Sequence, residues 1–434
     1  MCYTIPALVE DVHKGVATIS YFGERKEAFC EFVSLSPGDY VYAQGGYVVE
    51  KILPRQAQKT LKAWKDVFFE LRKIDAASAA LDSRDISSNL RLQKILERVR
   101  QNIIPSREEA LYLLNLEDVQ SQLLVRRTAN YLRQQYHNNS CCVHGILEIS
   151  NICARNCAYC GISSSSHAAR YRMSFDEIIA AVGEAINKFG FKSLVLQSGE
   201  ECGYSPDELA CIVAGIKKEF PVLVFVSFGE IGIEGLKQLY AAGSRGLLLR
   251  FETSNPALYK KLHPGCNLNS RLDHLRAAYE MGYLIVTGGL IGLPGATRED
   301  LVNDIILTSS LHAEMFSFGP FLPHPLTPLA AFPAPSEQDV LGVLALARLM
   351  CAQKAKILVT TAYETLSSSA RENGLMAGGN SIMINVTPLR YRPLYTIYPH
   401  RAHEGQTVSQ QVRQALAMLK SFGRGPTDLG TLKA

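Results

Sequence analysis

Long apolar runs are missing from this sequence. No stretch of about 18 apolar residues occurs, which is the minimum for a helix that crosses a bilayer. The first residues, Met1-Cys2-Tyr3, also lack the basic start and apolar run of a signal peptide. We therefore expect a cytoplasmic protein without a membrane partner.

Blocks of like charge are missing as well. The 45 basic and 41 acidic residues leave a net charge of only +4, so no surface for nucleic acid is expected. Internal repeats and low-complexity segments are also absent. What remains is an apolar fraction of 47%, typical of a globular protein, in a chain of 434 residues that has room for a large barrel and a smaller unit.

Cysteine is too sparse for a disulfide scaffold, since the whole chain has 11. Three of them, Cys153, Cys157 and Cys160, nevertheless fall close together. Such a group favours metal binding in a reducing compartment.

The first part of the chain has the pattern of a small β-barrel. Short β-type runs such as Val16 to Tyr21 recur up to Ile52, separated by turn residues such as Ser36-Pro37-Gly38-Asp39. Apolar residues at helical spacing from Ala57 to Arg72 predict a closing helix. We expect this unit to span residues 1–75 and a linker to span 76–93.

The remainder, residues 94–434, predicts an α/β fold. Apolar strand-like runs alternate with helical segments, and eight candidate strands follow one another: Gly145 to Ser150, Ser193 to Gln197, Val222 to Ser227, Gly246 to Arg250, Leu284 to Ile291, Met315 to Gly319, Ile357 to Thr361 and Ser381 to Asn385. Buried parallel strands joined by helices are the pattern of a (β/α)8 barrel, whose chemistry lies on the loops after the strands. A C-terminal helix is expected to close it.

The three clustered cysteines follow the first of these strands. Their spacing, with three and then two residues between them, allows one 4Fe-4S cluster to be held with its fourth iron left without a protein ligand. A small molecule with an amino and a carboxylate group, such as the methionine part of S-adenosylmethionine, can chelate that iron. An electron from the cluster would then release a 5′-deoxyadenosyl radical.

A structural zinc site or three unrelated buried cysteines is the alternative. Zinc would need a fourth ligand nearby. The nearest candidates are Cys141, Cys142, His144 and His167, which do not form a familiar zinc-binding spacing with the group.

Polar residues after later strands agree with the cluster hypothesis. Ser198, Gly199 and Glu200 follow the second strand, and Arg250 and Glu252 follow the fourth. Carboxylates and a guanidinium suit a zwitterionic ligand, because arginine binds a carboxylate through two parallel hydrogen bonds. A simple β-turn or a salt-bridged loop is the alternative for each residue taken alone.

The cysteine motif, with Tyr159 before its third cysteine, matches the radical-SAM superfamily. From about Leu96 to His403 the chain resembles the HydE-type maturases of FeFe hydrogenase. The matched segments include Glu148-Ile-Ser-Asn-Ile-Cys153, Tyr171-Arg172-Met173, Leu196 to Glu200, Arg250 to Thr253, Ile291 to Gly295, Gly319 to Pro325, Thr360-Thr361 and Tyr391 to Tyr395.

The resemblance implies roles for individual residues. Cys153, Cys157 and Cys160 would hold the cluster. S-adenosylmethionine would be bound by Tyr159, Ser198, Gly199, Glu200, Glu252 and Arg271. The substrate cavity would be lined by Arg250, Thr360, Thr361, Tyr391 and Tyr395. No cysteine follows Cys351, so a single cluster is expected.

The family's substrate is an organometallic iron species that carries CO, cyanide and cysteine. The resemblance therefore implies a sulfur-containing iron carbonyl/cyanide precursor as substrate, an external electron donor, and other hydrogenase maturation proteins as partners. Two alternatives stay open. One is a radical-SAM enzyme with an organic substrate, as in biotin synthase or methylornithine synthase, and the other is a noncatalytic metallochaperone, which the intact cysteine triad disfavours.

Residues 1–75 resemble a different family, the HypC-type assembly chaperones of nickel-iron hydrogenase, through Met1-Cys2-Tyr-Thr-Ile-Pro6, Gly38-Asp39 and Gly46-Tyr47. In that family the cysteine at position two helps to carry an Fe(CN)2CO unit, which implies Cys2 as a metal ligand here. Gln44 stands where the family has a histidine, and glutamine is a poorer iron ligand than imidazole. A docking or stabilising role for this unit is the alternative.

Overall fold

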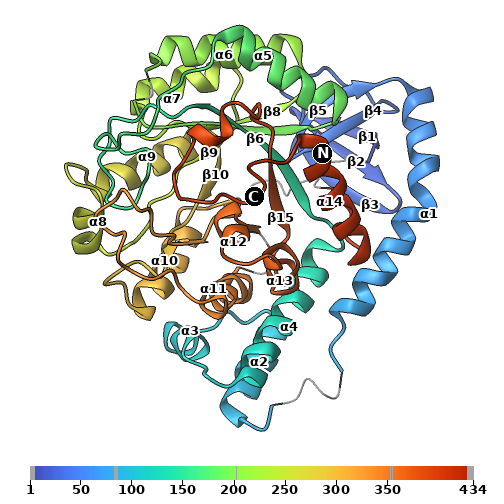
Figure 1. The fold of residues 1–434 in the computed structure, drawn as a ribbon. Helices are drawn as coiled ribbons and strands as arrows, with labels where there is room; N and C mark the ends of the chain where they lie inside the picture. Colours follow the sequence, from blue (N-terminus) through green and yellow to red (C-terminus); the bar gives the residue numbers. More distant parts are fainter. Residues whose placement is uncertain (1–4, 83–86, 202, 352, 354, 428–434) are drawn as a thin grey trace.

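The computed structural model describes residues 5–82, 87–201, 203–351, 353 and 355–427. Two closed β-barrels of different size make up the fold, and Figure 1 shows the small one (blue) beside the large one. In the described ranges, no helix has both the length and the apolar character needed to span a bilayer. Both barrels confirm the architecture predicted from the sequence.

The small N-terminal barrel, here called the front barrel, has the strand order β1-β2-β3-β5-β4. Its strands are β1 (Ala7–His13), β2 (Val16–Tyr21), β3 (Glu24–Phe29), β4 (Tyr40–Gln44) and β5 (Tyr47–Ile52). Small side chains such as Ala17, Ala28 and Ala43 fill its core, which lets five short strands close tightly.

The closing helix α1 (Pro54–Ala79) is longer than the predicted segment from Ala57 to Arg72. Pro54 lies in its first turn, where the missing N–H costs nothing. The predicted linker is helical at both ends, because α1 covers residues 76–79 and α2 begins at Leu90. This corrects the extent of the linker: contacts of Asp75 with the large barrel continue the helix past the last apolar residue of the pattern.

The large barrel follows α2 (Leu90–Arg100), α3 (Arg107–Leu114) and α4 (Val119–His137). Its strands are all parallel and run in the order β10-β12-β14-β15-β6-β7-β8-β9. They are β6 (Cys142–Ser150), β7 (Ser193–Ser198), β8 (Leu223–Ser227), β9 (Gly246–Leu248), β10 (Leu284–Thr287), β12 (Met315–Phe316), β14 (Lys356–Val359) and β15 (Ser381–Asn385). Each lies within or across one of the eight predicted runs.

Two predicted strands are interrupted. The run from Leu284 to Ile291 divides into β10 and β11 (Leu290–Ile291), and the run from Met315 to Gly319 divides into β12 and β13 (Gly319–Pro320). Strand β11 pairs with β13 outside the closed barrel. Gly288 stands at the break with a φ of 154°, and a Cβ there would lie 2.4 Å from Ser317 O. The close approach of two backbones therefore requires glycine at this position.

Helices cover the outside of the large barrel (Figure 1). They are α5 (Phe175–Gly183) with a π-helical turn at Glu184–Lys188, α6 (Pro206–Glu219), α7 (Gly232–Ala241), α8 (Pro256–Leu262), α9 (Leu268–Glu280), α10 (Arg298–Ser310), α11 (Glu337–Met350), α12 (Thr361–Leu366), α13 (Ala370–Met376) and α14 (Val408–Ser421), with a 3-10 turn at Arg392–Leu394.

The front barrel closes the floor of the large barrel, meaning the N-terminal ends of its strands. Tyr47 and Val49 of β5 share one apolar cluster with side chains from six strands of the large barrel: Val195, Leu223, Phe225, Leu284, Val286, Met315, Leu358 and Met383. The ion pairs Lys192–Glu50 and Arg245–Glu31 flank this contact. The floor is therefore filled by residues of another unit.

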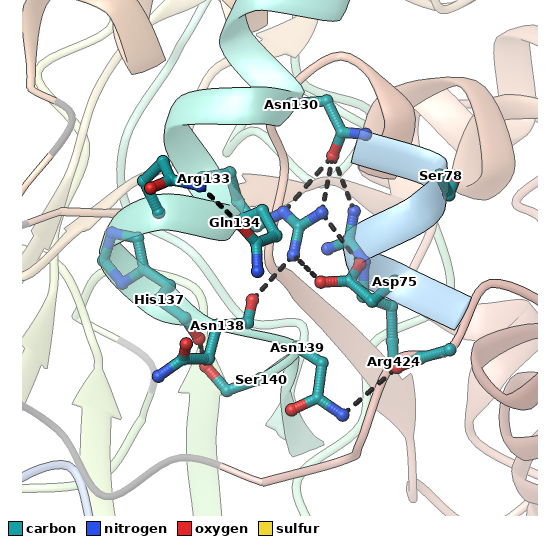
Figure 2. Close-up of polar contacts among 12 residues, drawn as sticks. Asp75, Ser78, Asn130, Arg133, Gln134, His137, Asn138, Asn139, Ser140 and Arg424 are labelled. Carbon is teal, nitrogen blue, oxygen red and sulfur yellow. Dashed lines mark hydrogen bonds and ion pairs between the residues drawn. The ribbon is translucent and has the colours of Figure 1, made fainter. Parts of the chain in front are cut away.

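A buried ion pair fastens α1 to the large barrel (Figure 2). Asp75 of α1 accepts two hydrogen bonds from Arg133 of α4, at 2.7 and 2.8 Å, and pairs with Arg424 at 2.7 Å. All three side chains are at most 1% exposed. Burial lowers the pKa of Arg424 to about 9, so this charge depends on its carboxylate partner.

Candidate active site

A cavity of about 300 Å³ opens at the C-terminal ends of the large barrel's strands. Its lining includes the three cysteines after β6, the segment Ser198 to Glu200 after β7, and residues after β9 and β14. This is the face where enzymes of this architecture carry their chemistry. The structure thus brings together most of the residues that were singled out in the sequence.

The three cysteine thiols lie close enough to repel one another as thiolates. The pKa of Cys157 is raised mainly by loss of solvation and, to a smaller extent, by the neighbouring Cys160 and Cys153. Loss of solvation likewise raises the pKa of Cys160 to about 12. Three such thiols are stabilised as thiolates when a cation binds them, so the donor set fits a metal group.

Among the described residues, no three His, Cys, Asp or Glu side chains meet at a distance that suits one metal ion. A 4Fe-4S cube would offer a different iron atom to each of the three thiolates.

The loop after β7 lies directly against the cysteine loop. A Cβ on Gly199 would lie 2.2 Å from Ile152 O and 2.6 Å from Cys153 Cβ. The amide of Ala154 donates to Glu200 O at 2.9 Å. Only glycine allows this approach, which joins the predicted cofactor-binding segment to the predicted cluster ligands.

Glu200 and Arg271 belong to one chain of charges beside the cysteines. Arg271 donates to Glu200 Oε2 at 3.1 Å and pairs with Glu230 at 2.6 Å, while Arg155 donates to Glu200 Oε1 at 2.6 Å. Glu200 and Arg271 are 7% and 9% exposed. Burial lowers the pKa of Arg271, and the carboxylates of Glu200 and Glu230 raise it by more, so the guanidinium stays charged.

Arg250 and Glu252 form a second pair on the cavity wall. Arg250 Nε donates to both Glu252 carboxylate oxygens at 3.1 Å. Glu252 holds a φ of +68°, a left-handed conformation that costs free energy for a residue other than glycine. Its amide donates to Gly288 O and its carbonyl accepts from Leu290 N, so the β10–β11 break fixes this strained position.

Aromatic and hydroxyl groups complete the lining. Tyr159 donates or accepts a hydrogen bond of 2.9 Å with His263 Nε2, and burial lowers the pKa of His263 to about 4, so the imidazole is neutral at pH 7. Thr360, Thr361 and Tyr395 also line the cavity. Thr360 Oγ1 accepts from Tyr363 N and caps α12, which orients it at the end of β14.

Tyr391 is not among the cavity residues, contrary to its predicted position. Its ring stacks on Tyr171 at a centroid distance of 4.7 Å, and its hydroxyl donates to Glu177 Oε1 at 2.6 Å. This side chain therefore braces the outside of the barrel against α5. Cys2, predicted as a metal ligand, lies outside the described residues.

Sequence reasoning missed a third charged pair in the cavity. Arg401 forms an ion pair with Glu148, which is 1% exposed on β6 and also accepts from Asn385 Nδ2 at 3.1 Å. A carboxylate inside the apolar run of β6 was a signal that could have marked Glu148. Arg401 had no such signal, because it lies in a loop 253 residues away.

Comparison with known proteins defines the class first. The family model for the radical SAM superfamily matches residues 147–307, and the model for the HupF/HypC family matches residues 1–64. The solved structure of methylornithine synthase (PylB) has the same fold, with a TM-score of 0.67 at 22% identity over 77% of this chain and 98% of that one. The chain is a radical-SAM enzyme, and radical-SAM enzymes use a 4Fe-4S cluster and S-adenosylmethionine.

Sequence relatives define the family within that class. The FeFe hydrogenase maturase subunit HydE of Thermotoga maritima is 36% identical over 335 residues, which is 77% of this chain and 95% of the relative. The 3-methylornithine synthase of Methanosarcina acetivorans is 27% identical over 299 residues, 68% of this chain and 84% of the relative. The chain therefore belongs to the HydE family.

Proposed function

We propose that this enzyme matures the metal cofactor of a hydrogenase by acting on a sulfur-containing iron carbonyl/cyanide precursor. The observation that carries the proposal is the composition of the cavity: cluster ligands on one side, and Arg250, Arg401 and the hydroxyls of Thr360 and Tyr395 around the rest. CO and cyanide ligands accept hydrogen bonds through their outer atoms. Guanidinium and hydroxyl donors suit an anionic complex of this kind.

The residues divide the work between cofactor and substrate. Cys153, Cys157 and Cys160 hold the cluster, which when bound supplies the electron that cleaves S-adenosylmethionine to the 5′-deoxyadenosyl radical. Glu200 and Arg271 bind the amino and carboxylate groups of the methionine part. The hydrogen bond to Glu252 fixes the orientation of the Arg250 guanidinium in the cavity wall before substrate binds.

The cavity test uses the full chain, reconstituted and reduced without oxygen. S-adenosylmethionine cleavage should accelerate when a cysteine-bearing iron carbonyl/cyanide complex is added, and Arg250→Met should remove the acceleration relative to the variant's own rate without the complex. The similarity to 3-methylornithine synthase favours a second candidate, an organic substrate. Turnover of an amino acid or thioether without any iron species would establish that candidate and overturn the proposal.

We also propose that the front barrel receives or hands over the iron carbonyl/cyanide cargo, in the cytoplasm and together with other maturation proteins and an external electron donor. The match to the HupF/HypC family model supports this role. Tethering raises the effective concentration of cargo at the enzyme. A Cys2→Ala variant should lose bound CO and cyanide infrared bands and keep S-adenosylmethionine cleavage. Unchanged bands would remove the carrier role.

A further inference from the structure

A second group of polar side chains is buried at the floor of the large barrel. Cys142 and His144 lie two residues apart at the start of β6 and are 1% and 3% exposed. They share the inner face of the strand with Ile146 and Glu148, which line the cavity further up. Neither Cys142 nor His144 lines that cavity, so they form a separate group.

The two side chains meet. Cys142 Sγ lies 2.9 Å from His144 Nε2, and His144 Nδ1 lies 2.8 Å from Ser193 Oγ on β7. With its proton on Nδ1, the imidazole donates to Ser193 and turns the lone pair of Nε2 toward the sulfur. Metal-binding histidines are oriented in this way, by a hydrogen bond from the nitrogen that does not bind the metal.

The front barrel reaches the same place. Gln44, the last residue of β4, is fully buried and donates from Nε2 to Cys142 Sγ at 3.3 Å. The edge of the front barrel where β4 ends thus lies against the sulfur of this pair.

We propose that Cys142 and His144 bind one divalent transition-metal ion at the junction of the two barrels. A thiolate with an imidazole suits the borderline metals, among them iron, nickel and zinc. Metal–sulfur and metal–nitrogen bonds of about 2.3 and 2.1 Å, at angles of roughly 90–110°, place sulfur and nitrogen about 3.1 to 3.6 Å apart. The observed 2.9 Å reaches that range after a shift of a few tenths of an ångström.

Binding releases the thiol proton of Cys142 to solvent, because the thiolate is the form of cysteine that binds a metal ion. Among the described residues no third His, Cys, Asp or Glu completes the pair. The ligand chemistry applies to any borderline metal. The choice of Fe2+ as the natural occupant rests on the proposed carrier function, whereas the site itself does not.

The test uses the full chain with Cys153, Cys157 and Cys160 changed to serine, which removes the cluster. Anaerobic titration with Co2+ should show one bound equivalent and a thiolate-to-cobalt charge-transfer absorption. Adding Cys142→Ala or His144→Ala should abolish the absorption. Cys141→Ala removes an equally buried thiol one residue earlier and should leave it unchanged. Fe2+ and Zn2+ should each compete for the site.

Two further measurements separate a metal site from a packing contact. Ser193→Ala should weaken Co2+ binding about 10- to 100-fold, because it frees the imidazole to rotate, while thermal unfolding stays cooperative. Cys142→Ala in the otherwise native chain should still cleave S-adenosylmethionine. Absence of the charge-transfer absorption, or an unchanged affinity in Cys142→Ala, would overturn the site. If the native chain binds Co2+ at this site but never shows bound CO and cyanide infrared bands, only the cargo role is removed.

Discussion

Arg401 and Glu148 form an ion pair inside the large barrel, on the wall of the cavity. Loss of solvation lowers the pKa of Arg401, and the neighbouring carboxylate raises it further than burial lowers it. The two charges therefore depend on each other, and either one alone would be buried without a partner.

Removing only one partner of the Arg401–Glu148 pair should destabilise the folded protein strongly. Arg401→Leu should lower the free energy of unfolding by about 3–5 kcal/mol, because Glu148 stays buried as an uncompensated charge. The double variant Arg401→Leu with Glu148→Leu should recover much of that loss. Urea unfolding followed by circular dichroism measures both. The exposed pair Arg276–Asp273 is the control, and its removal should change little. Additive losses in the double variant would contradict the coupling.

Loss of the Asp75 carboxylate should destabilise the attachment of α1 to the large barrel. Asp75→Ala leaves Arg133 and Arg424 buried without a carboxylate, which should cost about 3–5 kcal/mol in chemical unfolding. Asp66 is exposed on the same helix, so Asp66→Ala is a matched control that should leave stability nearly unchanged. Equal effects of the two substitutions would mean that the buried pair does not hold the helix.

Gly199 should be intolerant of a side chain. Gly199→Ala places a methyl group 2.2 Å from Ile152 O, so the cysteine loop must move and iron and sulfide content per chain should fall severalfold. Gly235 lies in α7, where an added methyl carbon would have its nearest neighbour at 3.4 Å, and Gly235→Ala should keep the cluster and gain up to about 1 kcal/mol of helix stability. Full cluster content in Gly199→Ala would refute the close approach.

Asp304 should make stability depend on pH. Burial, with smaller contributions from Asp300 and Glu252, raises the pKa of Asp304 to about 7, although Ser254 N donates to it at 2.6 Å. Between the unfolded value near 4 and about 7 the folded state holds the extra proton, so stability falls as pH rises through this window and then levels off.

The variant Asp304→Asn removes this titration and can keep the hydrogen bond from Ser254. Its stability relative to the wild type should therefore rise from pH 4 to pH 7, by about 4 kcal/mol at most, and stay constant above. Urea unfolding at several pH values measures the difference. A difference that does not change with pH would show that Asp304 titrates normally in the folded chain.

The barrel strands were predictable because parallel strands buried on both faces appear as continuous apolar runs. The division at Gly288 was not, since it follows from the approach of Ser317, far away in sequence. The pair Tyr391 and Tyr395 shows the same limit. A 3-10 turn at Arg392–Leu394 makes the two tyrosines point in different directions, so only Tyr395 lines the cavity. The sequence motif does not show the direction of either side chain.

The shared apolar cluster between β5 and the strands of the large barrel has a consequence for dissecting the protein. Cutting the chain after α1 would remove the contacts of Tyr47 and Val49 with Phe225, Leu284 and their neighbours. Both halves would then expose an apolar surface to solvent. Each excised half should therefore aggregate unless the two are coexpressed.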